Sequence, residues 1–113
     1  MRSRIIFSVQ NRGAVLPFHH QHIVRNLIEN ATQAFKLKPN ETMSYCFSGL
    51  KGQTKLNRNG LQFTSHRVTI IFSSSNRDLI LHGLKNIFSQ ELIQLGPLNV
   101  KPEYAEEEIP PAF

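Results

Sequence analysis

The sequence predicts a single α+β domain in which strands and helices alternate along the chain. Its 113 residues match the size of one domain and are enough to bury a core. Apolar residues recur at strand spacing in some segments and at helix spacing in others. The clearest junction runs from Gly60 to Asp78, where a glycine, an alternating strand and a Ser/Asn/Asp helix start follow without a gap.

The first half of the chain predicts a strand, a helix and a second strand. Residues 4–9 alternate, with Ile, Phe and Val on one face, as in a half-buried strand. After Pro17, apolar residues follow one side of a helix from residue 23 to residue 35. Residues 42–47 alternate again, with Met, Tyr and Phe on one face, and predict the second strand.

The second half begins with a hairpin loop, residues 49–60, which contains three glycines. Residues 61–73 predict a third strand, with a bend near Thr64 and Ser65. Such a long alternating run after a glycine-rich loop favours a strand that pairs back on its predecessor.

A second helix and a last strand complete the chain. Ser75 or Asn76 is expected to cap the helix, whose buried side runs from residue 80 to residue 88. A Gly-Pro pair at Gly96 turns the chain into the last strand, residues 98–104.

The predicted order is therefore βαββαβ. Two right-handed crossovers joined through a hairpin give a ferredoxin-like fold, with a four-stranded antiparallel sheet and both helices on one face. This domain is expected to span residues 1–105. Residues 106–113 contain three glutamates and two prolines without a core-forming pattern, and predict an acidic tail or the start of a linker to a second domain.

The charge of the chain indicates a polyanionic partner. The formal net charge is +5. Without the acidic residues from Glu106 onward, the 13 Lys and Arg residues face five Asp and Glu rather than eight, for a net charge of +8. A basic body with an acidic tail is typical of proteins that bind nucleic acid, although improved solubility explains it equally well.

The compartment is predicted to be the cytoplasm. Cys46 is the single cysteine and cannot form an internal disulfide, which fits a reducing environment. No apolar run approaches the roughly 20 residues of a membrane span, and the apolar segment at the N-terminus is too short for a signal peptide. We expect no membrane partner.

Three histidines, His19, His20 and His22, lie where the first helix is predicted to begin. A helix N-terminus offers N–H groups to a phosphate, and a neutral imidazole there could accept a proton from a ribose 2′-OH. Zinc binding is a weaker alternative, because no paired cysteine or carboxylate has ligand spacing. Packing at the helix start, with ring nitrogens bonded to the backbone, is the simplest interpretation.

The loop before the third strand is the second candidate for contact with RNA. Its glycines would let a phosphate approach the backbone, and Lys51, Lys55 and Arg58 supply positive charge. His66 and Arg67 follow on the adjoining strand. The loop lacks the Gly-Lys-Ser/Thr ending of a P-loop, so nucleotide hydrolysis is not indicated. A solvated hairpin loop would have a similar composition.

Several segments together resemble one protein family. The matching segments are Arg2-Ser-Arg-Ile-Ile-Phe, Leu16-Pro-Phe-His-His-Gln, Tyr45-Cys-Phe-Ser-Gly-Leu-Lys-Gly, Gly60-Leu-Gln-Phe-Thr-Ser-His-Arg-Val, Phe72-Ser-Ser and Leu95-Gly-Pro-Leu-Asn-Val-Lys-Pro-Glu. In order and spacing they resemble the CRISPR-associated endoribonuclease that cuts precursor CRISPR RNA at its repeats, in the repeat-associated mysterious protein superfamily.

The resemblance implies cleavage without a metal or another cofactor: the 2′-OH attacks and leaves a 2′,3′-cyclic phosphate and a 5′-OH. It also implies two tandem ferredoxin-like domains, of which this chain resembles the N-terminal one. A Tyr-His-Lys set known in some members has no counterpart, since the first helix lacks a Tyr and residues 33–41 lack a His. Members with a histidine at the helix start instead suggest His20 and His22 for proton transfer, with Lys51 or Lys55 as the cation.

The leading hypothesis is therefore an endoribonuclease domain that cleaves CRISPR repeat RNA. One alternative is a non-catalytic RNA-binding or assembly module, whose partners would include other CRISPR-associated proteins. A third is a ligand-sensing ferredoxin-like domain that forms a homodimer through its sheet, which leaves the basic loop unexplained.

Overall fold

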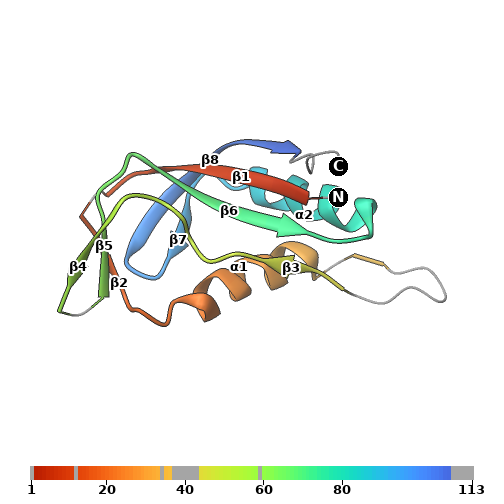
Figure 1. Cartoon of the computed structure of the whole chain (residues 1–113). Coiled ribbons are helices and arrows are strands. Elements are labelled where there is room, and N and C mark those ends of the chain that lie inside the picture. Colours follow the sequence, from red (N-terminus) through yellow and green to blue (C-terminus); the bar gives the residue numbers. More distant parts are fainter. Residues whose placement is uncertain (1, 12, 34, 37–43, 59, 108–113) are drawn as a thin grey trace, which may run out of the picture.

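A computed structural model describes residues 2–11, 13–33, 35–36, 44–58 and 60–107 (Figure 1). In chain order its elements are β1 (Arg2–Val9), β2 (Val15–Leu16), α1 (Gln21–Thr32), β3 (Cys46–Phe47), β4 (Thr54–Asn57), β5 (Gly60–Phe63), β6 (Arg67–Ser73), α2 (Arg77–Phe88), β7 (Ile93–Leu95) and β8 (Leu98–Glu107). The α+β class and the two helices are as predicted. Residues 42 and 43 of the predicted second strand lie outside the described residues.

The strands form two antiparallel sheets rather than the predicted four-stranded one. The main sheet has five strands in the order β3-β6-β1-β8-β7, and a small sheet has the order β2-β5-β4. The fifth strand of the main sheet is β7, which pairs with β8 through the turn at Gly96. The predicted four-stranded count was wrong because a three-residue strand carries too short a pattern to be detected.

The predicted strand over residues 61–73 is in fact two strands in different sheets. Between β5 and β6 the chain bends, and Thr64 N–H donates to the Gln53 carbonyl at 2.9 Å while Ser65 Oγ donates to the Arg67 carbonyl at 2.7 Å. As a result β5 pairs with β4 and β2, whereas β6 pairs with β1 and β3. The predicted hairpin loop, residues 49–60, thus contains strand β4.

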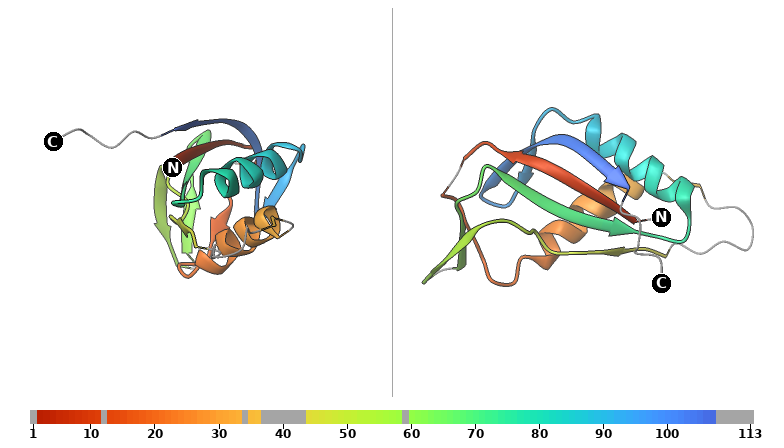
Figure 2. Two further views of the ribbon diagram at one scale, coloured as in Figure 1. Left: turned by 90° about the vertical axis from the view of Figure 1, so that its right-hand side faces the viewer. Right: turned by 45° about the horizontal axis from the view of Figure 1, so that its top comes forward.

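Both helices pack on one side of the main sheet, which curls around them (Figure 2). The core joins buried residues of the sheet to the inner faces of the helices; its members include Ile5, Phe7, Val24, Leu27, Ile28, Val68, Ile70, Phe72, Ile80 and Ile87. The other side of the sheet is open. Arg67 and Thr69 project to that open side, because the residues that alternate with them in β6 are buried in the core.

The helix boundaries follow from local hydrogen bonds. Asn76 caps α2, since its Oδ1 accepts the Leu79 N–H at 3.3 Å, as the sequence predicted. The first helix ends at Thr32 rather than at residue 35. There the Ala31 carbonyl accepts the Asn86 side-chain amide at 2.6 Å and the Thr32 carbonyl accepts the Phe35 N–H at 3.1 Å, so both terminal carbonyls have partners without further helix.

Strand β8 continues past the predicted domain boundary. Glu106 and Glu107 pair with Arg4 and Ser3 of β1 in the ladder. Glu106 also forms an ion pair with Arg4 at 3.5 Å. Neither described helix is long and apolar enough to cross a membrane.

Candidate nucleic-acid interface

A groove on the open side of the molecule contains three of the predicted RNA-binding residues. We call it the basic groove; it is an open depression of about 570 Å³ lined by Lys51, Gly52, Gln53, Thr64, Ser65, His66, Arg67 and Thr69. His66 and Arg67 are consecutive where β6 begins, whereas Lys51 comes from the segment between β3 and β4. The fold therefore brings the side chain of Lys51 into the same groove as that of Arg67, although the two residues lie in different segments of the sequence.

Backbone hydrogen bonds hold Lys51 against the edge of the main sheet. Its N–H donates to the Thr69 carbonyl and its carbonyl accepts the Thr69 N–H, both at 2.9 Å. The next residue, Gly52, lies close to the β6 chain: a Cβ there would be 2.9 Å from Ser65 Oγ and 3.3 Å from the Arg67 carbonyl. A glycine at this position thus lets the segment lie flat in the groove.

An acidic partner compensates the charge of Arg67. Its guanidinium donates to both carboxylate oxygens of Glu103, at 2.7 and 3.1 Å. These hydrogen bonds, with the opposite charges, raise the pKa of Arg67 above its ordinary value and lower the pKa of Glu103. Lys51, in contrast, makes no ion pair with any other described residue. Lys51 is therefore the cation of the groove best placed to meet a phosphate.

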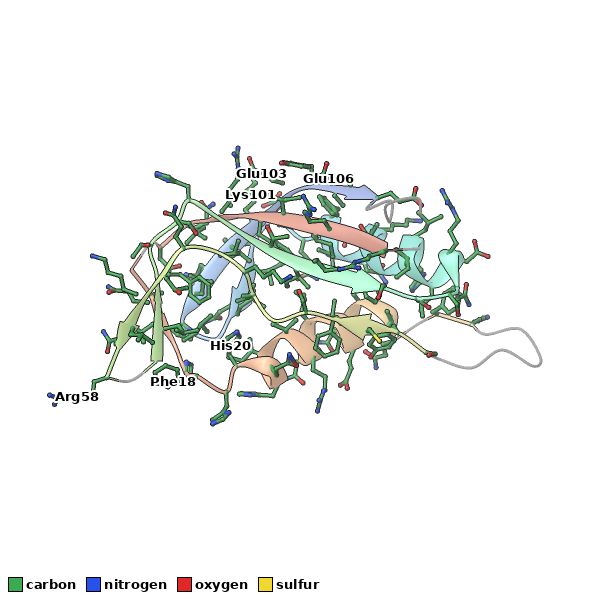
Figure 3. All side chains as sticks on the ribbon, viewed as in Figure 1. Phe18, His20, Arg58, Lys101, Glu103 and Glu106 are labelled. Carbon is green, nitrogen blue, oxygen red and sulfur yellow. The ribbon has the colours of Figure 1, made fainter. Side chains whose placement is uncertain are left out.

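The other two predicted cations lie elsewhere. Lys55 is on β4, an edge strand whose four residues are all exposed, and Arg58 follows at the end of the hairpin. Figure 3 shows Arg58 at the outer end of this hairpin, on the same side of the molecule as Phe18. Leu56 on β4 is 84% exposed and Phe18 is 52% exposed. The hairpin thus carries exposed apolar and basic side chains outside the basic groove.

The structure separates the three histidines at the start of α1 by burial. His19 and His22 are exposed, whereas His20 is only 9% exposed and precedes the first residue of α1 (Figure 3). His20 Nδ1 lies 3.1 Å from the Pro17 carbonyl, and its ring packs edge-on against Phe63. The tautomer with hydrogen on Nδ1 donates to this carbonyl and leaves Nε2 as an acceptor.

The buried ring of His20 adjoins the segment that leads to Lys51. A Cβ on Gly49 would lie 3.5 Å from His20 Nε2, so the acceptor nitrogen faces this glycine. His20 thereby links the start of α1 to the chain after β3. The His20 ring is therefore packed as expected for a histidine at a helix start, and its contacts hold Nε2 in a fixed direction.

His22 lines a second groove, which we call the amide groove. This groove has a volume of about 460 Å³ and is lined by His22, Ile23, Asn26, Leu27, Asn30, Gln90, Ile93, Gln94, Leu95 and Gly96. It lies between α1, the chain after α2, and β7. Since α1 covers the inner side of the main sheet, the amide groove and the basic groove are on different sides of that sheet.

The sequence did not single out Tyr104 as a candidate. Tyr104 is 48% exposed on β8 and lies opposite Ile6 of β1, which in turn lies opposite Thr69 of β6. Thr69 also pairs with Lys51, so Tyr104 and Lys51 are at the two ends of one row across the sheet. Exposed aromatic rings on a sheet can stack on RNA bases. The sequence could have indicated Tyr104 only as an aromatic residue in the last predicted strand.

Acidic residues also reach the open side of the sheet. Lys101, Glu103 and Glu106 follow one another along β8 (Figure 3). Glu103 and Glu106 are paired with Arg67 and Arg4. Among residues 2–11, 13–33, 35–36, 44–58 and 60–107, no group of three or more His, Cys, Asp or Glu side chains is arranged to hold a metal ion.

Comparisons with known proteins establish the fold. No protein-family model matches the chain, and no curated protein matches it in sequence. Among solved structures, a CRISPR-associated protein Cas6 superposes with a TM-score of 0.79 at 18% identity, over 100% of this chain and 51% of that one.

Two further solved structures are similar. One is described as an RAMP protein binding different RNA substrates, with a TM-score of 0.77 and 20% identity. The other is a Cas6-related protein from Pyrococcus furiosus, with a TM-score of 0.77 and 18% identity. Each match covers 97% of this chain and 50% of the other. The resemblance predicted from the sequence is thus confirmed at the level of the fold, and the chain spans about half the length of the structures it matches.

Proposed function

We propose that this chain is an RNA-binding domain of the Cas6 type that cleaves precursor CRISPR RNA within its repeats. The observation that supports this most is the likeness of the whole chain to solved Cas6 and RAMP structures. The RAMP structure is described as binding RNA, which agrees with the excess of basic residues here. RNA is the proposed partner, and other CRISPR-associated proteins or a second copy of the chain are further candidates.

In this proposal the basic groove holds the RNA backbone. Lys51 supplies a charge without an acidic partner among the described residues, and Gly52 lets the segment that carries Lys51 lie close to β6. His66 and Arg67 line the same groove. Lys55, Arg58 and His19 are proposed to contact the RNA outside it, the first two from the exposed hairpin and the third from the start of α1.

Cleavage would use the RNA's own 2′-OH and no metal. A neutral imidazole removes the 2′-OH proton as O2′ bonds to phosphorus, and the bond from phosphorus to O5′ breaks. O5′ then takes up a proton, so the products are a 2′,3′-cyclic phosphate and a 5′-OH. The proposal assigns this proton transfer to His22 and His20, with Lys55 as the cation that stabilises the charged phosphorane, because Lys51 lies in the basic groove on the other side of the main sheet from His22.

The two histidines differ in how RNA could reach them. His22 is exposed and meets solvent directly. His20 is 9% exposed, and its Nε2 lies beside Gly49, so RNA has much less access to it than to His22. We therefore propose His22 as the main proton-transfer residue and His20 as the second.

A non-catalytic RNA-binding module is the second candidate. The burial of His20 and its hydrogen-bonding distance to the Pro17 carbonyl favour a packing role for that residue. The chain also spans about half of the Cas6 structures that it matches. Cleavage by this chain alone is therefore the first part of the proposal to test.

The test is cleavage of a labelled CRISPR repeat RNA in EDTA, with analysis of the product ends. We expect the wild-type chain to leave a cyclic phosphate, and His22→Ala to lower the single-turnover rate at least about 100-fold, the size of a typical general acid–base contribution. Glu29→Ala, at an exposed position of the same helix, is the matched control and should cut at the wild-type rate.

Three outcomes would count against the enzyme. They are the absence of cutting by the wild type, cutting at the wild-type rate by both His22→Ala and His20→Ala, and cutting that requires a divalent metal. Binding of the RNA without cutting would support the non-catalytic module instead. Absence of RNA binding at low salt would favour the ligand-sensing alternative.

A further inference from the structure

The amide groove has a polar lining without formal charge. Asn26, Asn30 and Gln90 contribute carboxamides, and Gln94 lies on the strand that forms one wall. None of the described residues that line it is Asp, Glu, Lys or Arg. A groove of this composition has nothing to neutralise a phosphate and no carboxylate to hold a hard cation. Its volume lies within the range of about 300–1,000 Å³ found for small-ligand sites.

The floor of the groove is apolar. Leu27, Ile93 and Leu95 are buried, and Ile23 is partly buried beside them. An apolar surface with carboxamides at its rim suits a flat, uncharged group that has donors and acceptors along its edge. A nucleobase is such a group, since its faces are apolar and its edges form hydrogen bonds.

The polar side chains follow one line along α1. His22, Asn26 and Asn30 are spaced four residues apart and so lie on one face of the helix. None of these three side chains forms a hydrogen bond with another described residue. Their donors and acceptors are therefore available to a ligand, and an imidazole stands at one end of the row.

The backbone of β7 adds donors and acceptors to the opposite wall. Gln94 of β7 lies opposite Asn99 of β8. The backbone N–H of Asn99 donates to Asn11 Oδ1 at 2.7 Å, and the Asn99 carbonyl accepts the Gln10 N–H at 2.8 Å, so neither group bonds to Gln94. The Gln94–Asn99 pair is therefore a non-hydrogen-bonded pair of the ladder. As β7 is the last strand of the main sheet, the N–H and C=O of Gln94 face the open edge.

We propose that the amide groove binds one unpaired nucleobase of the RNA, adenine in preference to uracil, and so selects the nucleotide that lies beside His22. Adenine has two hydrogens on N6, so its N6/N7 and N6/N1 edges can each pair with one carboxamide at the same time, whereas uracil has the single donor N3–H and can pair in this way with only one. Bases of single-stranded RNA are accessible to such contacts. This inference rests on the proposed function, because it takes RNA to be the partner and His22 to lie at the cleaved nucleotide.

The first test compares the affinity of the chain for oligoadenylate and oligouridylate of equal length. We expect the wild type to prefer oligoadenylate, and the Asn26→Ala/Asn30→Ala double variant to lose about tenfold of this preference, the effect of one bidentate base contact. The salt dependence of binding should stay unchanged, since no charge is removed. Gln21→Ala removes an exposed carboxamide from α1 outside the groove and is the matched control.

Equal preferences in the double variant and the wild type would overturn the inference. The inference would also be overturned if the double variant lost affinity for both RNAs and its binding depended less on salt. That result would mean that the groove binds the phosphate backbone of the RNA rather than a base.

A second test separates this inference from the proposed function. Adenosine and uridine are titrated into the free chain while the side-chain amide signals of Asn26 and Asn30 are followed by NMR. Shifts of these signals with adenosine alone support the groove as a base site, even if the chain bound no RNA and the proposed function failed. Absence of such shifts overturns the inference, even if RNA binding and cleavage were demonstrated.

Discussion

The basic groove and the amide groove lie on different sides of the main sheet and differ in what they offer a ligand. The basic groove has the cations Lys51 and Arg67 beside a glycine, with an ion pair to Glu103 at its border. The amide groove has carboxamides above an apolar floor, and no Asp, Glu, Lys or Arg is among its described lining residues. The first can attract any polyanion, whereas the second can distinguish one uncharged group from another.

This difference separates two tasks of an RNA-binding protein. Contacts to phosphates position a nucleic acid and depend on salt, while contacts to bases carry the sequence information. In this chain the two kinds of lining are drawn from different elements, with β6 and the preceding segment on one side and α1 with β7 on the other. Substitutions in one groove should therefore leave the property of the other unchanged.

The largest effect on RNA affinity is expected from reversing the charge of Lys51, which forms no ion pair with another described residue. Lys51→Glu should lower affinity for any single-stranded RNA at least about tenfold at low salt, and should reduce the slope of log affinity against log salt by about one or more. The measurement is a fluorescence titration at several salt concentrations. Lys85→Glu makes the same change of net charge on α2 and should have an effect of only about twofold, because salt screens distant charges.

The preference for oligoadenylate should be the same in Lys51→Glu and wild type. A change of that preference would show that the two grooves do not act separately. Equal losses in Lys51→Glu and Lys85→Glu would show that net charge, rather than the groove, controls binding.

A smaller effect, of opposite sign, is expected at the ion pair. Glu103→Gln removes the carboxylate that holds Arg67, and the released guanidinium should raise RNA affinity about two- to fivefold at low salt. Glu91→Gln changes net charge equally at a position that forms no ion pair within the described part of the chain. The proposal for Arg67 fails if both variants gain equally or neither gains.

The smallest effect concerns stability and pH. Arg67 lowers the pKa of Glu103 in the folded state. The ion pair therefore contributes its full stabilisation above the pKa of a glutamate in the unfolded chain, about 4.3. This contribution disappears as the pH falls through the lower pKa of Glu103 in the folded protein. The raised pKa of Arg67 has the opposite sense and would matter only in strong alkali. Both groups are exposed, so the contribution is small.

Thermal unfolding of wild type and Glu103→Gln at pH 7 and pH 3 measures this contribution. We expect the wild type to have the higher Tm at pH 7, by less than about 2 °C, and the two Tm values to converge at pH 3. A difference that persists or grows at pH 3 would mean that Glu103 stabilises the fold by another route.

Local patterns predicted the elements that depend on short-range physics. In strand β1 the buried residues Ser3, Ile5 and Phe7 are two apart, as expected for one face of a strand, and α2 begins at a capping Asn76. By contrast, β4 is exposed at all four residues, so it has no apolar alternation that would indicate a strand. It exists because β5 lies beside it, and β5 lies there because the chain bends after Phe63.

The basic groove was predicted in part. The sequence places His66 and Arg67 on one strand and Lys51 in the loop before it, but the distance along the chain does not show that Lys51 pairs with Thr69. Lys55 and Arg58 carry the same chemistry and lie outside the groove. The amide groove was not predicted, although the four-residue spacing of His22, Asn26 and Asn30 was visible in the sequence.

By itself, the sequence determined the α+β class, the basic character of the chain and the presence of three histidines at the start of α1, because composition and periodicity are local properties. Only the tertiary structure decided that His20 is buried against Phe63 while His22 faces a groove. It also decided that Arg67 meets Glu103, 36 residues away, whereas Lys51 remains without an ion-pair partner among the described residues. Burial and charge pairing depend on segments distant in the chain, and only the packing of the sheet and helices brings those segments together.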